Sequence, residues 1–211
     1  MFGDIVKNKL NFSLSKDTKE KLSLWEECFK NYNSHTNLMS KSDIEVLFEK
    51  HVFDSLAILK WEKFLNQKTL LDVGTGGGFP SVILAICFPE IKIYANDSRI
   101  KKINFIKEIK EKLELNNLEI IYSRIEDVKP LNVDVITNRA VGNLLNVYEL
   151  AKKHIKQNGY FISYKSKTVY EEIANFKKKY KKADFKIIPY ELPLKDNFTR
   201  NLTIIKKCDI I

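Results

Sequence analysis

The residues best suited to chemistry in this sequence form a glycine-rich turn. The short apolar stretch 70–73, which contains Asp72, leads into Gly74-Thr75-Gly76-Gly77-Gly78-Phe79-Pro80 and then into a second apolar run, 82–88. Because glycine lacks a Cβ atom, such a turn allows positive φ and lets a ligand lie against the backbone. In open α/β sheets, a turn of this kind binds adenosine-bearing cofactors at the carboxyl ends of the strands. The candidate cofactor-binding residues of this segment are Asp72, Gly74, Gly76, Gly78 and Phe79.

An acidic residue after the next predicted strand supports the same site. Residues 91–96 have the composition of a strand, and Asp97 follows them about twenty residues after the glycines. At that position a carboxylate could accept hydrogen bonds from both hydroxyls of a ribose. Asp97 could also cap the following helix, and the two roles are compatible.

The spacing of the turn favours one class of cofactor over two others. Phe79 stands at the sixth position counted from Gly74, where a dinucleotide-binding turn has its third glycine close to a pyrophosphate. A Walker phosphate loop is excluded, because no Lys followed by Ser or Thr comes after the glycines. We therefore expect S-adenosylmethionine, which has no phosphate to bind, rather than NAD or a nucleoside triphosphate.

Two more predicted strands end in polar residues at the same edge of the sheet. Residues 118–122 lead into Ser123-Arg124-Ile125-Glu126-Asp127, which would lie beside the adenine; a solvated helix start is the alternative for the two acids. Residues 133–137 end at Asn138-Arg139-Ala140, in the crevice where the strand order of such sheets reverses and the reacting groups meet. Arg139 is therefore expected in the active site rather than in a surface ion pair.

Lys165 and the pair formed by His51 and Asp54 are further candidates. Lys165 ends the predicted strand 160–164 and would share the rim of the crevice with Arg139, where it could contact a phosphate. His51 and Asp54 are three residues apart, so on a helix they share a face and could act as an acid/base pair. We favour the alternative that they orient their helix over the cofactor pocket by hydrogen bonds.

A helical segment before the first strand would cover these residues. The apolar side chains of 15–32 recur every three or four positions, which predicts a helix whose stripe packs on the main domain. The residues of the stripe are Leu22, Trp25, Phe29 and Tyr32. Turn residues at 31–37 follow, and Ser42-Asp43 then caps a further helix. Residues 61–67 end the helical segment.

After the glycine turn, helices alternate with strands. Pro89 ends the first helix, and Asp97 or Ser98 begins the second, whose buried side would be Ile100, Ile103, Phe105, Ile106, Ile109 and Leu113. The remaining segments are a helix at 142–155, a turn at Asn158-Gly159, a lysine-rich helix at 168–180 and two edge strands, 185–189 and 202–206, in an antiparallel hairpin. The pattern predicts a Rossmann-like α/β fold with a mostly parallel sheet of seven strands. Residues 1–66 would form a helical extension and residues 67–211 the main domain.

The charge of the chain indicates an acidic partner. Its 211 residues include 36 Lys and Arg against 27 Asp and Glu, a net charge of +9, which favours nucleic acid. Lysine supplies nearly all of this charge, as it would in a chain shaped by the base composition of its genome. Arginine is more informative, because a planar guanidinium suits phosphates and base edges. The arginines are Arg99, Arg124, Arg139 and Arg200.

Cysteine content and apolar runs bound the environment of the protein. Cys28, Cys87 and Cys208 are odd in number and unrelated in spacing, so we expect neither a disulfide framework nor a metal site. No stretch is long and apolar enough to span a membrane, and the first residues do not resemble a signal peptide. We therefore expect a cytoplasmic protein.

Together, these motifs resemble the RsmG family, whose older name is glucose-inhibited division protein B. The resemblance extends over about residues 20–207 and rests on the joint occurrence and order of the motifs. The matching motifs are Asn37-Leu38-Met39, the segment 51–56, the turn 71–80, Asp97-Ser98, Ser123-Arg124-Ile125-Glu126 and Asn138-Arg139-Ala140. Members are bacterial methyltransferases that use S-adenosylmethionine to methylate N7 of one guanine in the 530 loop of 16S ribosomal RNA. The resemblance therefore implies the class I methyltransferase fold.

The resemblance also implies roles for particular residues. Cofactor contacts are expected at Gly74, Phe79, Ile125, Glu126 and Arg139, with Asp97 and Ser98 at the ribose position. Independently of the resemblance, we predict that Arg139, with Lys165 and Arg200, holds the substrate guanine or its phosphates. Arg139 and Lys165 are thus the candidate catalytic residues, and Arg124, Lys165 and Arg200 the candidate RNA-binding residues. The family's turn commonly has proline, leucine and a last glycine where this chain has Gly77, Phe79 and Ser81. The Ser81 side chain falls where helix and strand approach each other.

The implied reaction needs little acid–base catalysis. Guanine N7 carries a lone pair and no proton, so alignment of nucleophile, methyl carbon and sulfur can suffice. In agreement, Asn138-Arg139-Ala140 stands where amino-methyltransferases have Asn-Pro-Pro-Tyr.

The alternatives are a small-molecule methyltransferase on the same fold, and a non-catalytic RNA-binding or ribosome-assembly protein, which Ser81 would favour. The expected partner is the small ribosomal subunit with its 16S RNA, and we expect a monomer without a metal.

Overall fold

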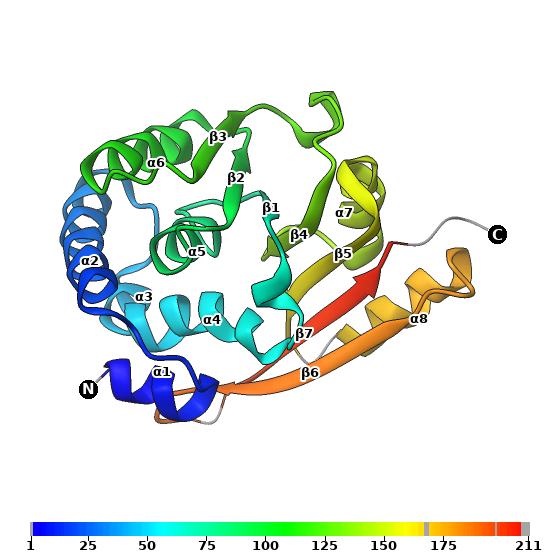
Figure 1. Cartoon of the computed structure of the whole chain (residues 1–211), viewed down its shortest axis with the longest axis horizontal. Coiled ribbons are helices and arrows are strands. Elements are labelled where there is room, and N and C mark those ends of the chain that lie inside the picture. The colour runs from blue at the N-terminus through cyan, green and yellow to red at the C-terminus, as the bar shows by residue number, and fades with distance from the viewer. Residues whose placement is uncertain (1, 167–168, 197, 208–211) are drawn as a thin grey trace.

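One seven-stranded sheet forms the centre of the computed structural model, which describes residues 2–166, 169–196 and 198–207 (Figure 1). The strand order is β3-β2-β1-β4-β5-β7-β6. The strands are β1 (Thr69–Val73), β2 (Lys92–Asp97), β3 (Leu118–Tyr122), β4 (Val133–Arg139), β5 (Ile155–Lys165), β6 (Phe185–Leu192) and β7 (Phe198–Lys206). Strands β1 to β5 pair in parallel, whereas β7 pairs antiparallel with β5 and β6. The predicted Rossmann-like sheet and its antiparallel edge hairpin are confirmed.

Helices cover both faces of this sheet. Those before β1 are α1 (Phe2–Leu10), α2 (Lys16–Thr36), α3 (Lys41–Glu45), the π-helix η1 (Leu47–Val52), α4 (Phe53–Leu56), η2 (Ala57–Lys60) and η3 (Phe64–Asn66). The later ones are α5 (Ser81–Cys87), α6 (Ile100–Lys112), η4 (Ile125–Asp127), α7 (Leu144–Ala151), η5 (Lys152–His154) and α8 (Val169–Lys179). In Figure 1, α2 and α6 lie on the opposite side of the sheet from α7 and α8. The side chains of adjacent strand residues therefore enter different cores. Leu70 packs in the core that includes α2 and α6, and Leu71 packs in the core that includes α7 and α8.

The helices before β1 share a hydrophobic core with the sheet. The predicted stripe of α2 is buried at Leu22, Trp25 and Phe29. The ring centroid of Phe29 lies 5.5 Å from that of Phe79 in the glycine turn and 5.2 Å from that of Phe105 in α6. The helical segment therefore packs directly against the turn that is predicted to bind the cofactor.

Local capping interactions move two helix boundaries from their predicted places. Helix α2 continues through the predicted turn residues to Thr36, because the chain leaves the helix only at Asn37, which adopts a left-handed φ of 52°. Ser40 rather than Ser42 caps α3, since the Ser40 Oγ accepts the Asp43 N–H at 3.2 Å. Both differences arise from local hydrogen bonds that the apolar pattern does not encode.

Two further boundaries also differ from the prediction. Arg99, not Asp97 or Ser98, is the N-cap residue of α6, and Ile100 is 46% exposed instead of buried. Residues 158–159 lie inside β5 rather than in a turn, because β5 begins at Ile155 and its register against β4 shifts. The first residue of the predicted helix 168–180 and Cys208 lie outside the described residues.

We expect Phe29→Ala to lower the free energy of unfolding by about 3–5 kcal/mol, the usual loss for a buried phenylalanine. Phe29 is 0% exposed and touches both the turn and α6. Urea unfolding, followed by tryptophan fluorescence and by circular dichroism, measures the loss. Leu24→Ala is the matched control, because Leu24 lies on the same helix and is 42% exposed. Separate transitions for the two probes, or equal losses in both variants, would contradict a shared core.

Candidate active site

The glycine turn adopts a backbone conformation that side chains would prevent. Gly74 has a φ of +70° and Gly78 a φ of +90°. A Cβ atom on Gly74 would lie 2.4 Å from a methyl group of Val141, and one on Gly78 would lie 2.5 Å from a methyl group of Val82. Both positions therefore require glycine, for φ and for space alike.

A buried hydrogen-bond network supports the turn from below. The Asp72 carboxylate is fully buried and accepts the Ser81 N–H at 3.3 Å and the Thr137 hydroxyl at 3.1 Å. The hydroxyl groups of Thr75 and Ser81 bond to each other. Burial raises the pKa of Asp72 to about 6, against hydrogen bonds that lower it. Ser81 thus fits between helix and strand, where it forms hydrogen bonds. Asp72, which was predicted to bind the cofactor, instead faces inward and supports the turn.

Asp97 ends β2 with both carboxylate oxygens engaged. Its Oδ2 accepts the Gly76 N–H at 2.9 Å, and its Oδ1 accepts the Arg99 N–H at 2.9 Å. The Arg99 guanidinium binds both oxygens as well, from Nε at 3.0 Å and from Nη2 at 2.9 Å. Burial alone would raise the pKa of Asp97, but the bonds from Arg99 and Gly76 outweigh it and hold that pKa below its ordinary value. Asp97 is therefore a preoriented carboxylate anion.

A cavity of about 430 Å³ opens at the carboxyl ends of β1, β2, β3 and β4. Five of the ten predicted cofactor residues line it, and they come from three separate loops. They are Gly74, Asp97, Ser98, Ile125 and Glu126, together with Arg124, which was predicted to bind RNA. The topology therefore gathers residues that are far apart in the sequence at one edge of the sheet.

A second cavity of about 400 Å³ adjoins the first. The two share Gly74, Arg99 and residues 140–141 in their linings, so they form two chambers of one crevice. Several other residues of the turn line the second chamber, together with charged side chains. Among these lining residues are Gly76, Phe79, His51, Asp43, Lys102 and Arg139. Gly78, by contrast, lines neither chamber among the described residues.

A buried carboxylate from the helical extension holds two arginines beside the second chamber. The side chain of Asp54 is only 4% exposed, and its Oδ2 accepts Arg139 Nη1 at 3.1 Å. Arg200 donates to both Asp54 oxygens at 3.2 Å, and the Tyr190 hydroxyl also bonds to Asp54. The Arg139 guanidinium lies over the Phe79 ring, 4.8 Å from its centroid. We call Asp54, Arg139, Arg200 and Tyr190 the Asp54 cluster.

His51 lies near this cluster but makes different contacts. Its ring packs against Phe79 at 5.3 Å between centroids, and its Nε2 lies 3.5 Å from Asp43 Oδ1. Burial, with the positive charge of Arg139, lowers the pKa of His51 to about 4. His51 is therefore neutral at neutral pH. No hydrogen bond joins His51 to Asp54 among the described residues, so the acid/base pair gains no support from the structure.

The remaining predicted substrate residues have different surroundings. Lys165 is buried, and its Nζ donates to the Gly142 carbonyl at 3.0 Å and to Glu172 Oε2 at 2.8 Å. Lys165 ends β5 next to Tyr164, which pairs with Arg139, but in the described part of the chain it lines neither chamber, and Glu172 of α8 supplies a partner for its charge. Arg124 has a side chain that is 75% exposed at the mouth of the first chamber.

Sequence reasoning missed two residues of the crevice, Arg99 and Lys102, and one residue of the Asp54 cluster, Tyr190. Arg99 lies two positions after Asp97, a spacing from which its bidentate contact could have been anticipated. Lys102 lines the second chamber and donates to the Leu38 carbonyl at 2.8 Å. Tyr190 comes from the edge hairpin, 136 residues after its partner Asp54, and no local pattern indicates such a contact.

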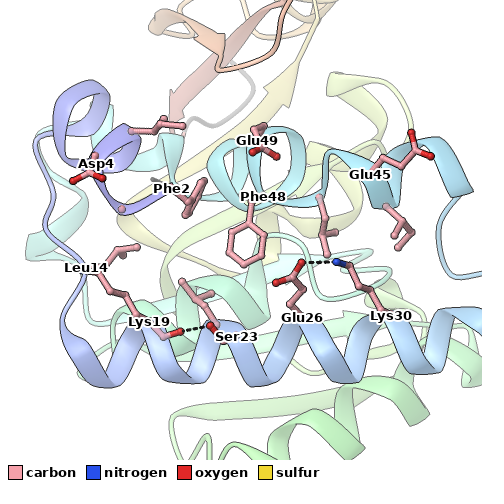
Figure 2. Close-up of a pocket in the computed structure, with 15 residues that line it drawn as sticks. Phe2, Asp4, Leu14, Lys19, Ser23, Glu26, Lys30, Glu45, Phe48 and Glu49 are labelled. Carbon is pink, nitrogen blue, oxygen red and sulfur yellow. Dashed lines mark hydrogen bonds and ion pairs between the residues drawn. The ribbon is translucent and has the colours of Figure 1, made fainter.

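Another cavity, of about 540 Å³, lies between α1, α2 and the segment 44–49 (Figure 2). In Figure 2, Phe2 and Phe48 line it, and their ring centroids are 4.9 Å apart. The ion pair between Lys30 and Glu26, at 2.6 Å, lies at its edge. None of the predicted cofactor residues lines it, so this cavity is separate from the crevice.

The fold and the crevice define the class of protein. A SAM-dependent methyltransferase from Aquifex aeolicus has a TM-score of 0.59 with this chain at 20% identity, covering 84% of this chain and 98% of that protein. At this identity the likeness concerns the fold alone. The chain therefore has the fold of the S-adenosylmethionine-dependent methyltransferases.

The family follows from the sequence. The sequence model of the GidB family, described as rRNA small subunit methyltransferase G, matches residues 18–203. Ribosomal RNA small subunit methyltransferase G of Mycoplasma capricolum subsp. capricolum is 36% identical over 187 residues, 88% of this chain and 80% of that protein. The protein of the same name in Clostridium botulinum (strain Eklund 17B / Type B) is 34% identical over 205 residues, 94% of this chain and 86% of that protein. The chain belongs to this family and is a methyltransferase, which confirms the resemblance.

Membrane-spanning helices and metal-binding clusters are both absent from the described residues. None of the helices in ranges 2–166, 169–196 and 198–207 combines the length and apolar character needed to cross a membrane. Within the same ranges, His, Cys, Asp and Glu side chains form no group of three or more that could hold a metal ion. Cys28 and Cys87 are free and buried.

We expect the neutral, buried His51 to make stability fall in acid. The pKa of His51 is about 4 in the folded protein against an ordinary 6.5, so its contribution is present above pH 6.5 and is lost as the pH falls towards 4. Between pH 7 and pH 5 the loss should be about 2 kcal/mol. Asp72 acts in the opposite direction, because its raised pKa of about 6 favours the folded state as the pH falls from 6.

Comparison with His51→Gln separates the two effects. Urea unfolding at pH 7 and at pH 5 should show that the variant loses about 2 kcal/mol less than the wild type over this range. His35→Gln is the control, because His35 is an exposed histidine on α2. If His51→Gln and the wild type lost the same stability in acid, His51 would not be the group that resists protonation.

Proposed function

We propose that this chain transfers the methyl group of S-adenosylmethionine to N7 of one guanine in the 530 loop of 16S ribosomal RNA. The family match over residues 18–203, together with the two-chambered crevice around Gly74, carries the proposal. The names of the relatives give methylation of small-subunit ribosomal RNA. The resemblance of the sequence motifs adds the N7 atom and the 530 loop.

The first chamber suits the adenosine part of S-adenosylmethionine, which supplies the reactive methyl group when it is bound. Asp97 offers two carboxylate oxygens as acceptors for a ribose diol, with Ser98 beside it. Ile125 offers an apolar side chain and Glu126 a carboxylate for the adenine ring. Gly74 lines both chambers, and a Cβ atom there would displace Val141, which lines both as well, so glycine preserves the wall that the two chambers share.

The second chamber suits the target guanine. Arg139 is fixed over Phe79 by Asp54, and that hydrogen bond uses one of the five N–H donors of the guanidinium. A guanine whose O6 or phosphate accepted from Arg139 would keep its N7 lone pair for the sulfonium methyl group. Phe79 adds an aromatic surface, and an unstacked base needs such contacts to stay outside its helix. Arg139 would thus hold the base without acting as a proton acceptor.

No general base is required in this mechanism. Guanine N7 loses no proton when it is methylated, so catalysis consists of aligning N7, the methyl carbon and the sulfur. His51, with its pKa lowered to about 4, lies against Phe79 as a neutral ring. We therefore interpret His51 as a packing residue of the second chamber.

The other RNA contacts that we propose are peripheral. Arg124 is exposed at the mouth of the first chamber, where it can bind a phosphate. Arg200 is held by Asp54 next to Arg139 and would act through the same cluster. Lys165 would have to leave Glu172 before it could contact RNA.

The proposed partner, oligomeric state and location follow from this reaction. The partner is the small ribosomal subunit or its RNA, in keeping with the net charge of +9. One chain supplies both chambers, so we propose that the monomer, with residues 1–66 packed on the main domain, is the active form. Its substrate places it in the cytoplasm.

Methyl transfer to small subunits tests the proposed function. The purified chain is incubated with labelled S-adenosylmethionine and with subunits from a strain that lacks its gene, and the modified base is then mapped. We expect label at N7 of one guanine in the 530 loop. Label at another atom or base would contradict the proposed substrate. Cofactor binding without any transfer would favour the small-molecule alternative.

We expect Arg139→Lys to lower kcat/KM for methyl transfer about 100-fold, because lysine keeps the charge but loses the planar fork. The matched control is Arg124→Lys, which makes the same chemical change at an exposed side chain and should cost no more than about 3-fold. Initial rates on small subunits measure both losses. Equal losses of kcat/KM in the two variants would show that Arg139 has no special role.

A further inference from the structure

The expected ribose acceptor is already occupied by a side chain of the protein. Arg99 Nε donates to Asp97 Oδ1 at 3.0 Å and Arg99 Nη2 donates to Oδ2 at 2.9 Å, a bidentate ion pair. If Asp97 binds the ribose diol, as the proposed function requires, the hydroxyls must take the lone pairs that this guanidinium now uses. The cofactor and the Arg99 side chain therefore compete for one carboxylate.

The Arg99 side chain can leave without disturbing the carboxylate. It is 62% exposed, so its charge is solvated when the pair opens, whereas the Asp97 side chain is only 3% exposed and relies on other hydrogen-bond donors to replace the guanidinium. Asp97 keeps two backbone donors, the N–H groups of Gly76 at 2.9 Å and of Arg99 itself at 2.9 Å. These donors hold the acceptor in place whichever group binds its remaining lone pairs.

The surroundings of Arg99 suit an anion once the pair has opened. Arg99 lines both chambers, and Lys102 and Arg139 line the second chamber with it. Lys102 is held at the crevice by the Leu38 carbonyl, and Arg139 by Asp54. A guanidinium that has lost a carboxylate matches a phosphate in the same bidentate geometry. The anion at hand in the proposed reaction is the phosphate backbone of the RNA.

We propose that the ribose of S-adenosylmethionine displaces Arg99 from Asp97, and that the released guanidinium binds a phosphate of the RNA substrate. Arg99 is thus a substrate-binding residue whose availability depends on the cofactor. Because coupling between two ligands is reciprocal, RNA that holds Arg99 also raises the affinity for the cofactor by the same factor. The inference rests on the proposed function for the identity of both ligands.

Cofactor binding is tested first, without any reaction. S-adenosylhomocysteine, which lacks the transferable methyl group, is titrated into the wild type, Arg99→Met and Lys101→Met by calorimetry. Lys101→Met is the matched control, because it removes one positive charge from an exposed position two residues later, on α6. We expect Arg99→Met to bind S-adenosylhomocysteine about 2- to 5-fold more tightly than the wild type, because the ligand no longer has to open an ion pair. Lys101→Met should match the wild type.

RNA binding is tested next, with unmodified small subunits in the presence and absence of saturating S-adenosylhomocysteine. We expect the ligand to tighten binding of the wild type and of Lys101→Met by the same factor of about 2 to 5, and to leave Arg99→Met unchanged. Weaker or unchanged S-adenosylhomocysteine binding by Arg99→Met would overturn the inference, as would equal coupling in all three proteins. A wild type that bound S-adenosylhomocysteine but not the subunit would instead refute the proposed substrate.

Discussion

The carboxylate of Asp54 fixes the chemistry of the crevice. It is nearly inaccessible to solvent, yet it carries the hydrogen bonds of two guanidinium groups and a tyrosine hydroxyl. Without it, Arg139 and Arg200 would be like charges held close together in a poorly solvated place, and breaking a buried pair of this kind costs about 3–5 kcal/mol. Asp54 therefore allows the protein to keep two arginines beside the cofactor turn.

This arrangement makes the N-terminal helices part of the candidate active site. Asp54 lies on α4, Arg139 at the end of β4, and Tyr190 and Arg200 on the edge hairpin, so the cluster joins three segments that are distant in the sequence. Phe79 forms a second link, because it touches Arg139 on one side and Phe29 of α2 on the other. The turn expected to hold the cofactor is thus packed between the extension and the sheet.

Local patterns predicted the framework better than the contacts within it. The glycine turn, the acid after β2 and the strand 118–122 can be found from the sequence, because each depends on neighbouring residues. The ion pairs of Asp54 and of Lys165 could not, since their partners come from other elements and are selected by packing. Asp72 shows the same limit: the sequence indicates an acid at the turn, but only the fold shows that it faces inward. Sequence analysis therefore predicted which loops meet at the crevice and left open which charges are free to bind a ligand.

If Asp54 acts on the reaction by positioning Arg139, the two residues must be energetically coupled. The direct measurement is a double-mutant cycle of single-turnover methyl transfer with Asp54→Asn, Arg139→Lys and the double variant, at a temperature where circular dichroism shows all of them folded. Each single change should slow transfer about 100-fold, and the double variant should be no more than about 3-fold slower than the slower single variant. A double variant slowed about 10⁴-fold, the product of the single losses, would show that Asp54 and Arg139 act independently.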